Sequence, residues 1–245
     1  MILQTEQGQF DLRQGFDLSI PVRRGANSVE AFYIPHAEME AFRGGDFVGS
    51  VPEGGACNCE NIKFNAHGNG THTECVGHVS KEAHYLPDSL KEHFFHAQLI
   101  SVVPMQNEEG DYLVHAHHIP ASLPEALIIR TLPNNEDKPF KKYSGTNPIY
   151  LHPDAATKIR ELGVKHLLID QPSVDKEEDG GALASHKNYW NYPSNPRMDA
   201  TITELIYVPT EVKDGLYLLN LMTAVIESDA VPSKPMIYAM ADAEG

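Results

Sequence analysis

The stretch NAHGNGTHTECVGHV, residues 65–79, concentrates three histidines and one glutamate within twelve positions. Thr71 and Thr73 favour extended backbone, and the glycines around them disfavour a helix. Side chains two positions apart on a strand share a face, so we expect His72 and Glu74 to point the same way. An imidazole and a carboxylate on one face can bind a divalent ion such as zinc. The segment therefore predicts a metal or catalytic site.

Two more histidines of the segment depend on how its backbone runs. His78 shares the face of His72 and Glu74 if the strand is unbroken as far as that residue. His67 would point away, unless a bulge or a left-handed residue within residues 68–70 reverses its facing. The alternative is a polar loop with ordinary surface histidines, and composition alone does not decide between the two.

Two other groups in the sequence offer competing metal sites. Cys57 and Cys59 could bind zinc with His67 or Cys75, but the usual C-x-x-C spacing is absent and no second pair follows. A buried thiol is the more plausible state of Cys75. A second histidine group is typical of a strand end with exposed imidazoles, although a metal role is the alternative: His115, His117 and His118.

Length and composition restrict the class of protein. The chain has 245 residues, 41% of them hydrophobic, which fits a single domain over residues 1–245 without a membrane-spanning run. A net charge of −15 disfavours nucleic acid and anionic membranes as partners. Three cysteines argue against a disulfide framework, and the first residues do not resemble a signal peptide. We therefore expect a cytoplasmic protein that acts on a small molecule.

Hydrophobic runs predict the strands and helices. Five short apolar runs are expected to be strands, and most are continuous, so their strands should be buried on both faces: residues 97–103, 126–131, 165–169, 216–223 and 236–240. A helix should have Asp154 as its N-cap, present Ile159 and Leu162 to the core, and end at Gly163. A shorter helix is expected within residues 86–95. These elements predict an α/β or α+β domain built on a substantial sheet.

Several motifs together resemble a known family. GTHTECVGH, residues 70–78, resembles the H-x-G-T-H-x-D-x-P-x-H signature of the cyclase family, which includes bacterial kynurenine formamidase (arylformamidase) and isatin hydrolase. FDLSIPV, residues 16–22, resembles the opening strand of that family. LGVKHLLIDQPSVD, residues 162–175, resembles its helix end, strand and acidic loop. Residues 184–190 and 201–209 resemble its later histidine and glutamate segments, so the likeness runs in order from Phe16 to the C-terminus.

The resemblance implies an α/β protein with a swivelling β/β/α domain, a mixed and largely buried sheet, and a homodimeric or homotetrameric assembly. It also implies a centre of one or two divalent ions, Zn²⁺ or Mn²⁺. His72 would be a metal ligand, Glu74 a shared carboxylate ligand, and His186 and Glu204 the distal ligands. The general acid and base would be His78.

The chain departs from the family pattern at several positions. Gly68 stands at the first motif position, and His67, which we take as a further ligand, is one residue early. Glu74 replaces the aspartate of the motif. His186 and Glu204 are eighteen positions apart, which is more than the family's usual spacing. These differences leave the number of metals and the substrate open.

The expected function is a metal-dependent hydrolase that cleaves an amide or a cyclic amide with metal-activated water. The alternatives are a binding protein with little metal on the same fold, and a metal-dependent lyase or cyclase acting on a small hydroxy or keto acid. Three polar residues are expected to orient the ligand histidines or to form a capped turn: Asp170, Ser173 and Asp175. Three aromatic residues near His186 belong either to the core or to an apolar pocket: Tyr189, Trp190 and Tyr192.

Overall fold

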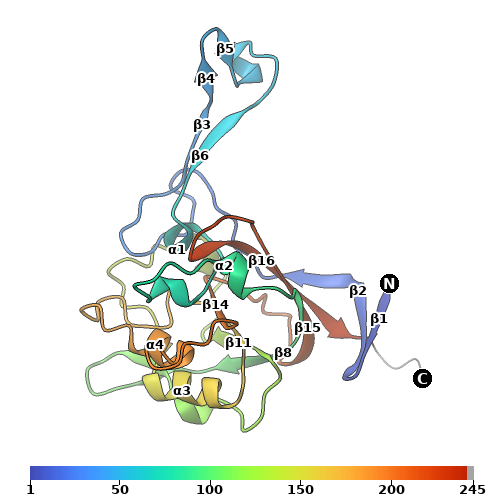
Figure 1. Ribbon diagram of the computed structural model, residues 1–245, viewed down its shortest axis with the longest axis vertical. Helices are drawn as coiled ribbons and strands as arrows, with labels where there is room; N and C mark the ends of the chain where they lie inside the picture. Colours follow the sequence, from blue (N-terminus) through green and yellow to red (C-terminus); the bar gives the residue numbers. More distant parts are fainter. Residues whose placement is uncertain (242–245) are drawn as a thin grey trace.

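Residues 1–241 are described by a computed structural model, in which the largest sheet closes on itself (Figure 1). The strand order is β1-β2-β16-β15-β8-β11-β13-β14-β7, and β7 also pairs with β16. Closure at β7 and β16 therefore makes a barrel of seven strands, with β1 and β2 appended beside β16. The strands of this sheet are β1 (Ile2–Thr5), β2 (Gly8–Asp17), β7 (His72–Glu74), β8 (Phe94–Val102), β11 (Ala126–Thr131), β13 (His166–Ile169), β14 (Thr201–Glu204), β15 (Gly215–Thr223) and β16 (Ala230–Met240).

The strands are both parallel and antiparallel. Strands β8, β11, β13 and β14 run parallel to one another, whereas β15, β16 and β7 pair with their neighbours antiparallel. In β11 every residue is buried. Ile128 belongs to one hydrophobic cluster, and its neighbours Leu127 and Ile129 belong to another on the opposite face. The continuous apolar runs thus fill both faces of the sheet, as predicted for strands of this kind.

Helix α3 (Pro153–Glu161) covers one face of the sheet, and α4 (Ala184–Trp190) lies beside it (Figure 1). Ala155 and Ile159 of α3 pack in the cluster that contains Leu127. The N-cap of α3 is His152 rather than the predicted Asp154, because the side chain of His152 accepts a hydrogen bond from the Asp154 N–H at 3.2 Å. Gly163 ends the segment in the left-handed region, at φ +83°.

The second predicted helix was largely wrong. Helix α2 occupies only Leu86–Ser89, and β8 begins at Phe94. Phe95 lies opposite Leu219 of β15 in the antiparallel ladder and is buried in the core. Burial of Phe95 between strands therefore outweighs the local preference for a longer helix.

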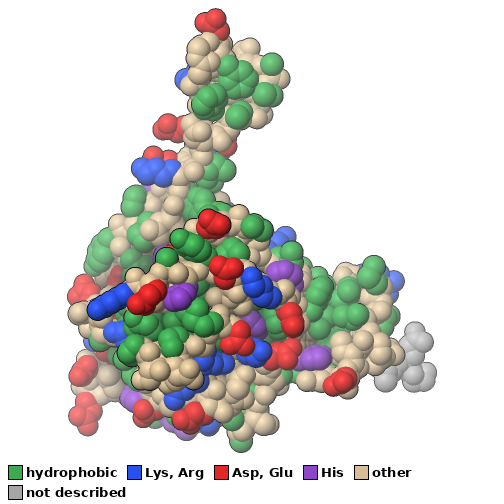
Figure 2. Space-filling model, viewed as in Figure 1, with side chains coloured by type: hydrophobic (Ala, Val, Ile, Leu, Met, Phe, Trp, Pro, Cys, Tyr) green, Lys and Arg blue, Asp and Glu red, His purple; other side chains and the backbone are tan. Residues whose placement is uncertain are grey.

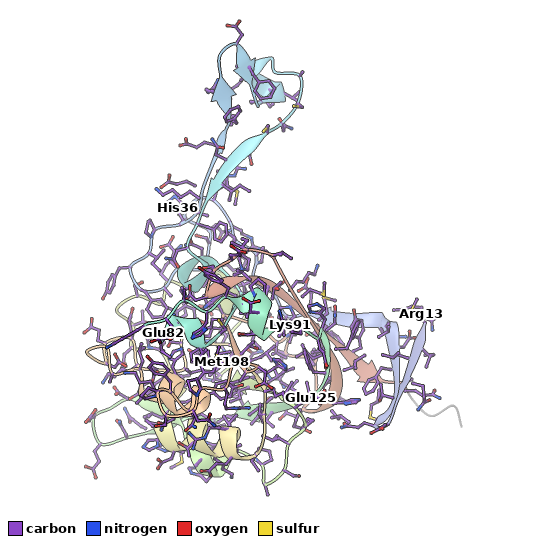
Figure 3. All side chains as sticks on the ribbon, viewed as in Figure 1. Arg13, His36, Glu82, Lys91, Glu125 and Met198 are labelled. Atoms are coloured by element: carbon purple, nitrogen blue, oxygen red, sulfur yellow. The ribbon has the colours of Figure 1, made fainter. Side chains whose placement is uncertain are left out.

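A hairpin arm, residues 38–63, extends away from the barrel (Figure 1). Strands β3 (Glu38–Ala41) and β6 (Glu60–Lys63) form its stalk, and β4 (Arg43–Gly44) and β5 (Phe47–Val48) lie near its tip. Figure 2 shows hydrophobic side chains gathered on the tip, and Figure 3 places His36 at the foot of the arm. Cys57 and Cys59 are exposed free thiols on it.

The remaining elements are small. A separate three-stranded sheet contains β9 (Met105–Gln106), β10 (Tyr112–Val114) and β12 (Tyr150–Leu151). Helix α1 (Ala66–Asn69) and a 3₁₀ turn at Val76–His78 flank β7. Within residues 1–241, none of the helices has the length and hydrophobicity needed to cross a membrane.

Candidate metal centre

The core of the centre is set by the pairing of two short strands. In the antiparallel ladder of β7 and β14, His72 lies directly opposite Glu204, and Glu74 lies opposite Ile202. His72 Nε2 is 3.3 Å from Glu204 Oε2. Ligand atoms of His72, Glu74 and Glu204 all lie within 4.8 Å of one another, and all three residues are buried. The alternation predicted for this segment therefore places His72 and Glu74 together.

His186 joins this core from α4. Its Nε2 lies 3.1 Å from Glu74 Oε1 and 3.6 Å from Glu204 Oε1. Its Nδ1 forms a 2.6 Å hydrogen bond with Asp175 Oδ2, and because a carboxylate can only accept, Nδ1 carries the proton. Asp175 also accepts hydrogen bonds from the backbone N–H groups of Ser185 and His186. The Asp175 carboxylate thus fixes the imidazole so that Nε2 faces the two glutamates. We call His72, Glu74, His186 and Glu204 the inner group.

His67 and His78 approach the same glutamate from the other side. Strand β7 ends at Glu74, yet the 3₁₀ turn Val76–His78 brings His78 Nδ1 to 3.6 Å from Glu74 Oε2. His67 lies on α1, and its Nδ1 is 3.2 Å from Glu74 Oε2. Ligand atoms of His67, Glu74 and His78 lie within 4.8 Å of one another. His78 therefore reaches the site although the strand breaks before it, and His67 arrives through a single helical turn rather than a bulge.

Packing explains why this motif has glycine where the family pattern has histidine. A Cβ atom at Gly68 would lie 2.8 Å from Ile34 Cδ1 and 3.0 Å from the Ala31 carbonyl oxygen. No side chain fits there. The turn of α1, which Asn65 caps by accepting from the His67 N–H at 2.9 Å, presents the preceding residue to the centre instead.

Asp229 is a member of the site that the sequence did not reveal. Its Oδ2 lies 3.3 Å from His67 Nε2 and 3.5 Å from His78 Nδ1. It immediately precedes β16, whose Ala230 lies opposite Glu74. The residue lies in an acidic and polar stretch that contains no motif, so it could be identified only once the β7–β16 register was known. We call His67, His78 and Asp229 the outer group.

The electrostatics of the centre arise from packing imidazoles against carboxylates. Burial alone lowers the pKa of His186, but the nearby carboxylates of Asp175, Glu204 and Glu74 outweigh it and raise that pKa well above its usual value. The pKa of His67 is likewise lowered by burial, yet Asp229 and Glu74 raise it to about 10. The carboxylates of the site therefore strongly stabilise positive charge.

Two buried polar atoms in the centre lack hydrogen-bond partners. His72 Nε2 and Glu74 Oε2 are enclosed, and although oppositely charged groups lie nearby, no hydrogen bond satisfies either atom. Buried polar groups are nearly always satisfied, so each such case calls for an explanation. An imidazole nitrogen and carboxylate oxygens form the donor set that zinc and related divalent ions prefer. The residues therefore fit a metal ion.

A cavity of about 330 Å³ opens beside the centre. Phe32, Ile34 and Leu183 give it apolar walls, and His67 and His78 also line it. Phe32 and Leu183 have left-handed backbone, at φ +56° and +46°, as does Leu205 after Glu204, at +52°. Bulky residues seldom adopt this conformation, and such strain concentrates at functional sites.

The other sequence-predicted groups lie elsewhere. Within the described residues, the two groups with the geometry for a metal ion both contain Glu74, and neither contains a cysteine or a residue of the His115 group. His115 stacks on His117 and His152, and the nearby carboxylate of Asp154 contacts only His152, at 3.6 Å from Nδ1. The Asp170 carboxylate binds the buried Lys138 ammonium at 2.6 Å rather than a ligand histidine. Among the described residues, neither competing group is gathered into the geometry of a metal centre, and Asp170 has a structural role.

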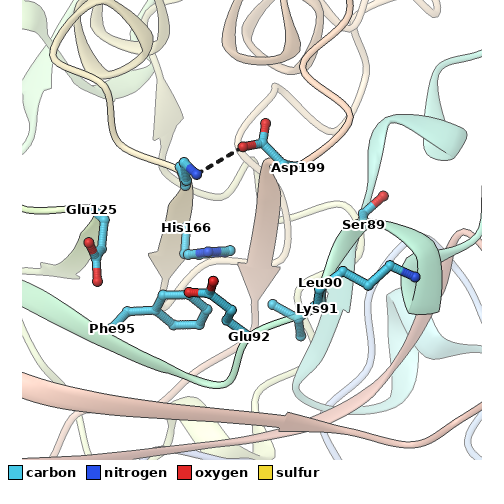
Figure 4. A pocket seen from close by; sticks show the side chains of 9 residues that line it. Ser89, Leu90, Lys91, Glu92, Phe95, Glu125, His166 and Asp199 are labelled. Carbon is cyan, nitrogen blue, oxygen red and sulfur yellow. Dashed lines mark ion pairs between the residues drawn. The ribbon is translucent and has the colours of Figure 1, made fainter.

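The aromatic residues near His186 are divided between core and surface. Tyr189 and Trp190 are fully buried in the cluster beneath α3, and Trp190 Nε1 donates to the Ala200 carbonyl at 2.9 Å. Tyr192 is half-buried and accepts from the Lys81 N–H. A separate pocket of about 150 Å³ lies around His166, where Phe95 and Glu125 line it (Figure 4). It contains none of the residues of the centre.

Barrel and centre together define a class: an α/β protein with a histidine–carboxylate cluster suited to a divalent metal. The sequence model of the Cyclase family matches residues 16–176. The chain belongs to the Cyclase family. No curated protein matches the chain.

Solved structures share the fold at low sequence identity. A potential metal-dependent hydrolase with cyclase activity has a TM-score of 0.67 and 13% identity, covering 93% of this chain and 98% of its own. An isatin hydrolase bound to the product analogue thioisatinate has a TM-score of 0.65 and 13% identity, covering 93% of both chains. Isatin hydrolase A from Ralstonia solanacearum has a TM-score of 0.62 and 14% identity, covering 92% of both chains. These likenesses confirm the α/β fold with a mixed, largely buried sheet, of swivelling β/β/α type.

Proposed function

We propose that the protein is a metal-dependent hydrolase that cleaves an amide or a cyclic amide, as arylformamidases and isatin hydrolases do. The observation that carries the proposal is the convergence of His72, Glu74, His186 and Glu204 in one buried cluster, in which His72 Nε2 and Glu74 Oε2 have no hydrogen-bond partner. The isatin hydrolases of the same fold support a cyclic amide as the substrate class.

The inner group would hold one divalent ion, and His67 with Glu74 would serve a second. Zn²⁺ or Mn²⁺ matches this mixture of imidazole and carboxylate ligands. A bound divalent ion supplies Lewis acidity, and it lowers the pKa of a coordinated water to about 7. The carboxylate of Glu74 contacts histidines of both groups. Its Oε1 faces His186 of the inner group, and its Oε2 faces His67 and His78 of the outer group.

His78 is the proposed proton carrier. Its side chain is about one-quarter exposed and lines the cavity, whereas those of His72 and His186 are almost entirely buried. Imidazole is the side chain best suited to both accept and donate a proton near neutral pH. His78 can therefore take a proton from the attacking water and return it to the leaving nitrogen.

The cavity supports a substrate with an apolar body. Phe32, Ile34 and Leu183 line the cavity together with the two histidines, and a volume of about 330 Å³ suits a small ring. Lys176, the lysine of this cavity, is already bound to Asp111 at 2.6 Å. Glu177 and Asp179 add negative charge to the lining, which favours a neutral substrate over an acidic one.

The test is hydrolysis assayed with and without metal. Purified protein should be stripped by chelator, reloaded with Zn²⁺ or Mn²⁺, and offered a neutral cyclic amide, an aryl formamide and a small keto acid. The proposal expects ring opening or deformylation that disappears on stripping and returns on reloading. Metal-dependent turnover of the keto acid alone would indicate a lyase or cyclase, and a chain that binds no metal would be a binding protein.

The proposed assembly is a homodimer or homotetramer in the cytoplasm. Exposed apolar side chains on the arm, Phe42, Phe47 and Ile62, support an association surface there. Light scattering of the purified protein tests the assembly, because a monomer at micromolar concentration would contradict it.

A further inference from the structure

Several contacts fix the position of Asp229 in the fold. Its carbonyl oxygen accepts a hydrogen bond from the Cys75 N–H at 3.0 Å, which ties it to the residue after Glu74. Its side chain also accepts from the Ser228 hydroxyl at 3.2 Å. Opposite it stands Gly77, where an added Cβ would lie 3.1 Å from Asp229 Cβ and 2.2 Å from the His84 carbonyl oxygen. The absence of a side chain at Gly77 leaves room for Asp229 beside the histidines.

The imidazole of His67 lies between two carboxylates, one on each nitrogen. Nδ1 is 3.2 Å from Glu74 Oε2, and Nε2 is 3.3 Å from Asp229 Oδ2. His186 has the same arrangement, with Asp175 on Nδ1 at 2.6 Å and Glu74 on Nε2 at 3.1 Å. In both rings one nitrogen faces Glu74 and the other faces an acid outside the inner group. Histidine ligands of metals usually donate their second N–H to such an acid.

Asp229 also faces the histidine that we propose as the proton carrier. Its Oδ2 lies 3.5 Å from His78 Nδ1, and the ring centroids of His67 and His78 are 4.5 Å apart. One carboxylate therefore contacts both rings of the outer group. A carboxylate beside Nδ1 favours the tautomer with a proton on Nδ1, which leaves Nε2 as the proton acceptor.

We propose that Asp229 is a positioning residue of this centre: it holds His67 with Nδ1 towards Glu74, and it holds His78 as the Nδ1–H tautomer. The inference rests on the proposed function, since it assigns the orientation of that site's own histidines. Asp229 thus orients His67 and His78 in the way that Asp175 orients His186. The centre has two supporting carboxylates, which come from different parts of the chain.

The test compares Asp229→Ala and Asp229→Asn with Glu227→Ala, an exposed acid two residues away that serves as the matched control. Protein labelled with ¹⁵N-histidine is studied metal-free and zinc-loaded by long-range ¹H–¹⁵N spectra, which distinguish the two imidazole tautomers. Zinc affinity is measured by competition with a chelator. Neither readout depends on turnover.

The wild-type protein and Glu227→Ala should show His78 as the Nδ1–H tautomer. Asp229→Ala should show a mixture of tautomers and about 10- to 100-fold weaker zinc binding, the usual cost of losing an acid that supports a ligand histidine. Asp229→Asn keeps an oxygen that can accept from Nδ1–H, so it should restore the tautomer but not the full affinity.

Unchanged tautomers and unchanged zinc affinity in Asp229→Ala would overturn the inference. If that variant does not fold, Asp229→Asn decides, because wild-type zinc affinity without the charge would contradict the proposed role. A wild-type chain that binds neither Zn²⁺ nor Mn²⁺ would refute the proposed function instead. The His78 tautomer of metal-free protein would then still test the placement of Asp229.

Discussion

Two buried histidines at opposite ends of the barrel strands have pKa values shifted in opposite directions. His166 begins β13, packs against Phe95 with ring centroids 3.9 Å apart, and shares a 2.9 Å hydrogen bond with Thr201. Burial, with Lys165 nearby, lowers its pKa to about 4. His186, equally buried, has a raised pKa because three carboxylates outweigh burial. Histidine burial alone is therefore ordinary packing, whereas burial together with carboxylates marks a centre that holds positive charge.

The largest expected effect comes from removing the Glu74 carboxylate, which contacts histidines of both the inner and the outer group. Glu74→Ala should abolish tight metal binding and lower hydrolysis by well over about 100-fold, which exceeds the usual cost of losing a supporting acid. The measurement is metal content by mass spectrometry together with turnover. Glu125→Ala, beside His166 at the other end, is the control and should retain both. Full metal content in Glu74→Ala would contradict the claim that histidines buried together with carboxylates form the metal centre.

The His78→Ala variant should lower turnover by about 10²- to 10⁴-fold, the usual contribution of a general acid and base, while metal is retained. Activity and metal content measured on the same preparation separate the two roles. If metal and activity are lost together, His78 belongs to the coordination shell instead.

Asp175→Asn should weaken metal binding by about 10- to 100-fold, because the His186 ring loses the charge that fixes its orientation. Chelator competition gives the affinity. Asp170→Asn is a useful contrast, since that acid binds Lys138 away from the ligands. It should reduce thermal stability but spare the metal affinity of folded protein, and the opposite pattern would exchange the roles of the two acids.

The smallest expected effect is on the pH dependence of stability and concerns His166, the buried histidine whose pKa is lowered. Its folded pKa of about 4 lies below the ordinary value of 6.5, so the unfolded state binds the additional proton. Stability should therefore fall as the pH drops from 6.5 towards 4, by up to about 3 kcal/mol from this residue. His166→Gln should flatten that slope in urea unfolding at a series of pH values. Equal slopes for variant and wild type would show that the histidine does not stay neutral.

Local patterns predicted the sheet and part of the centre. The run at residues 126–131 coincides with β11, and the alternation of His72 and Glu74 was correct because β7 covers both residues. The resemblance to the family supplied His186 and Glu204, which the structure brings to the same place. Periodicity alone could not join them, because both lie more than a hundred positions from His72. Glu204 meets His72 through the pairing of β14 with β7, and His186 reaches the site from α4.

What the sequence could not show depends on register and on burial. Asp229 enters the centre because Ala230 pairs with Glu74, and nothing in its local sequence distinguishes it from other acids. The helix expected through Phe95 failed because the barrel buries that side chain between strands. The histidines at 115, 117 and 118 looked comparable in sequence to those of the centre, but they lack the converging carboxylates.

The most direct test of the central claim is anomalous diffraction at the zinc absorption edge from crystals of zinc-loaded protein. The account predicts a peak at about 2.0–2.2 Å from His72 Nε2 and from carboxylate oxygens of Glu74 or Glu204. A zinc-loaded crystal with no anomalous peak in that cluster, or with peaks only at His115, His117 and His118 or at the arm cysteines, would contradict it.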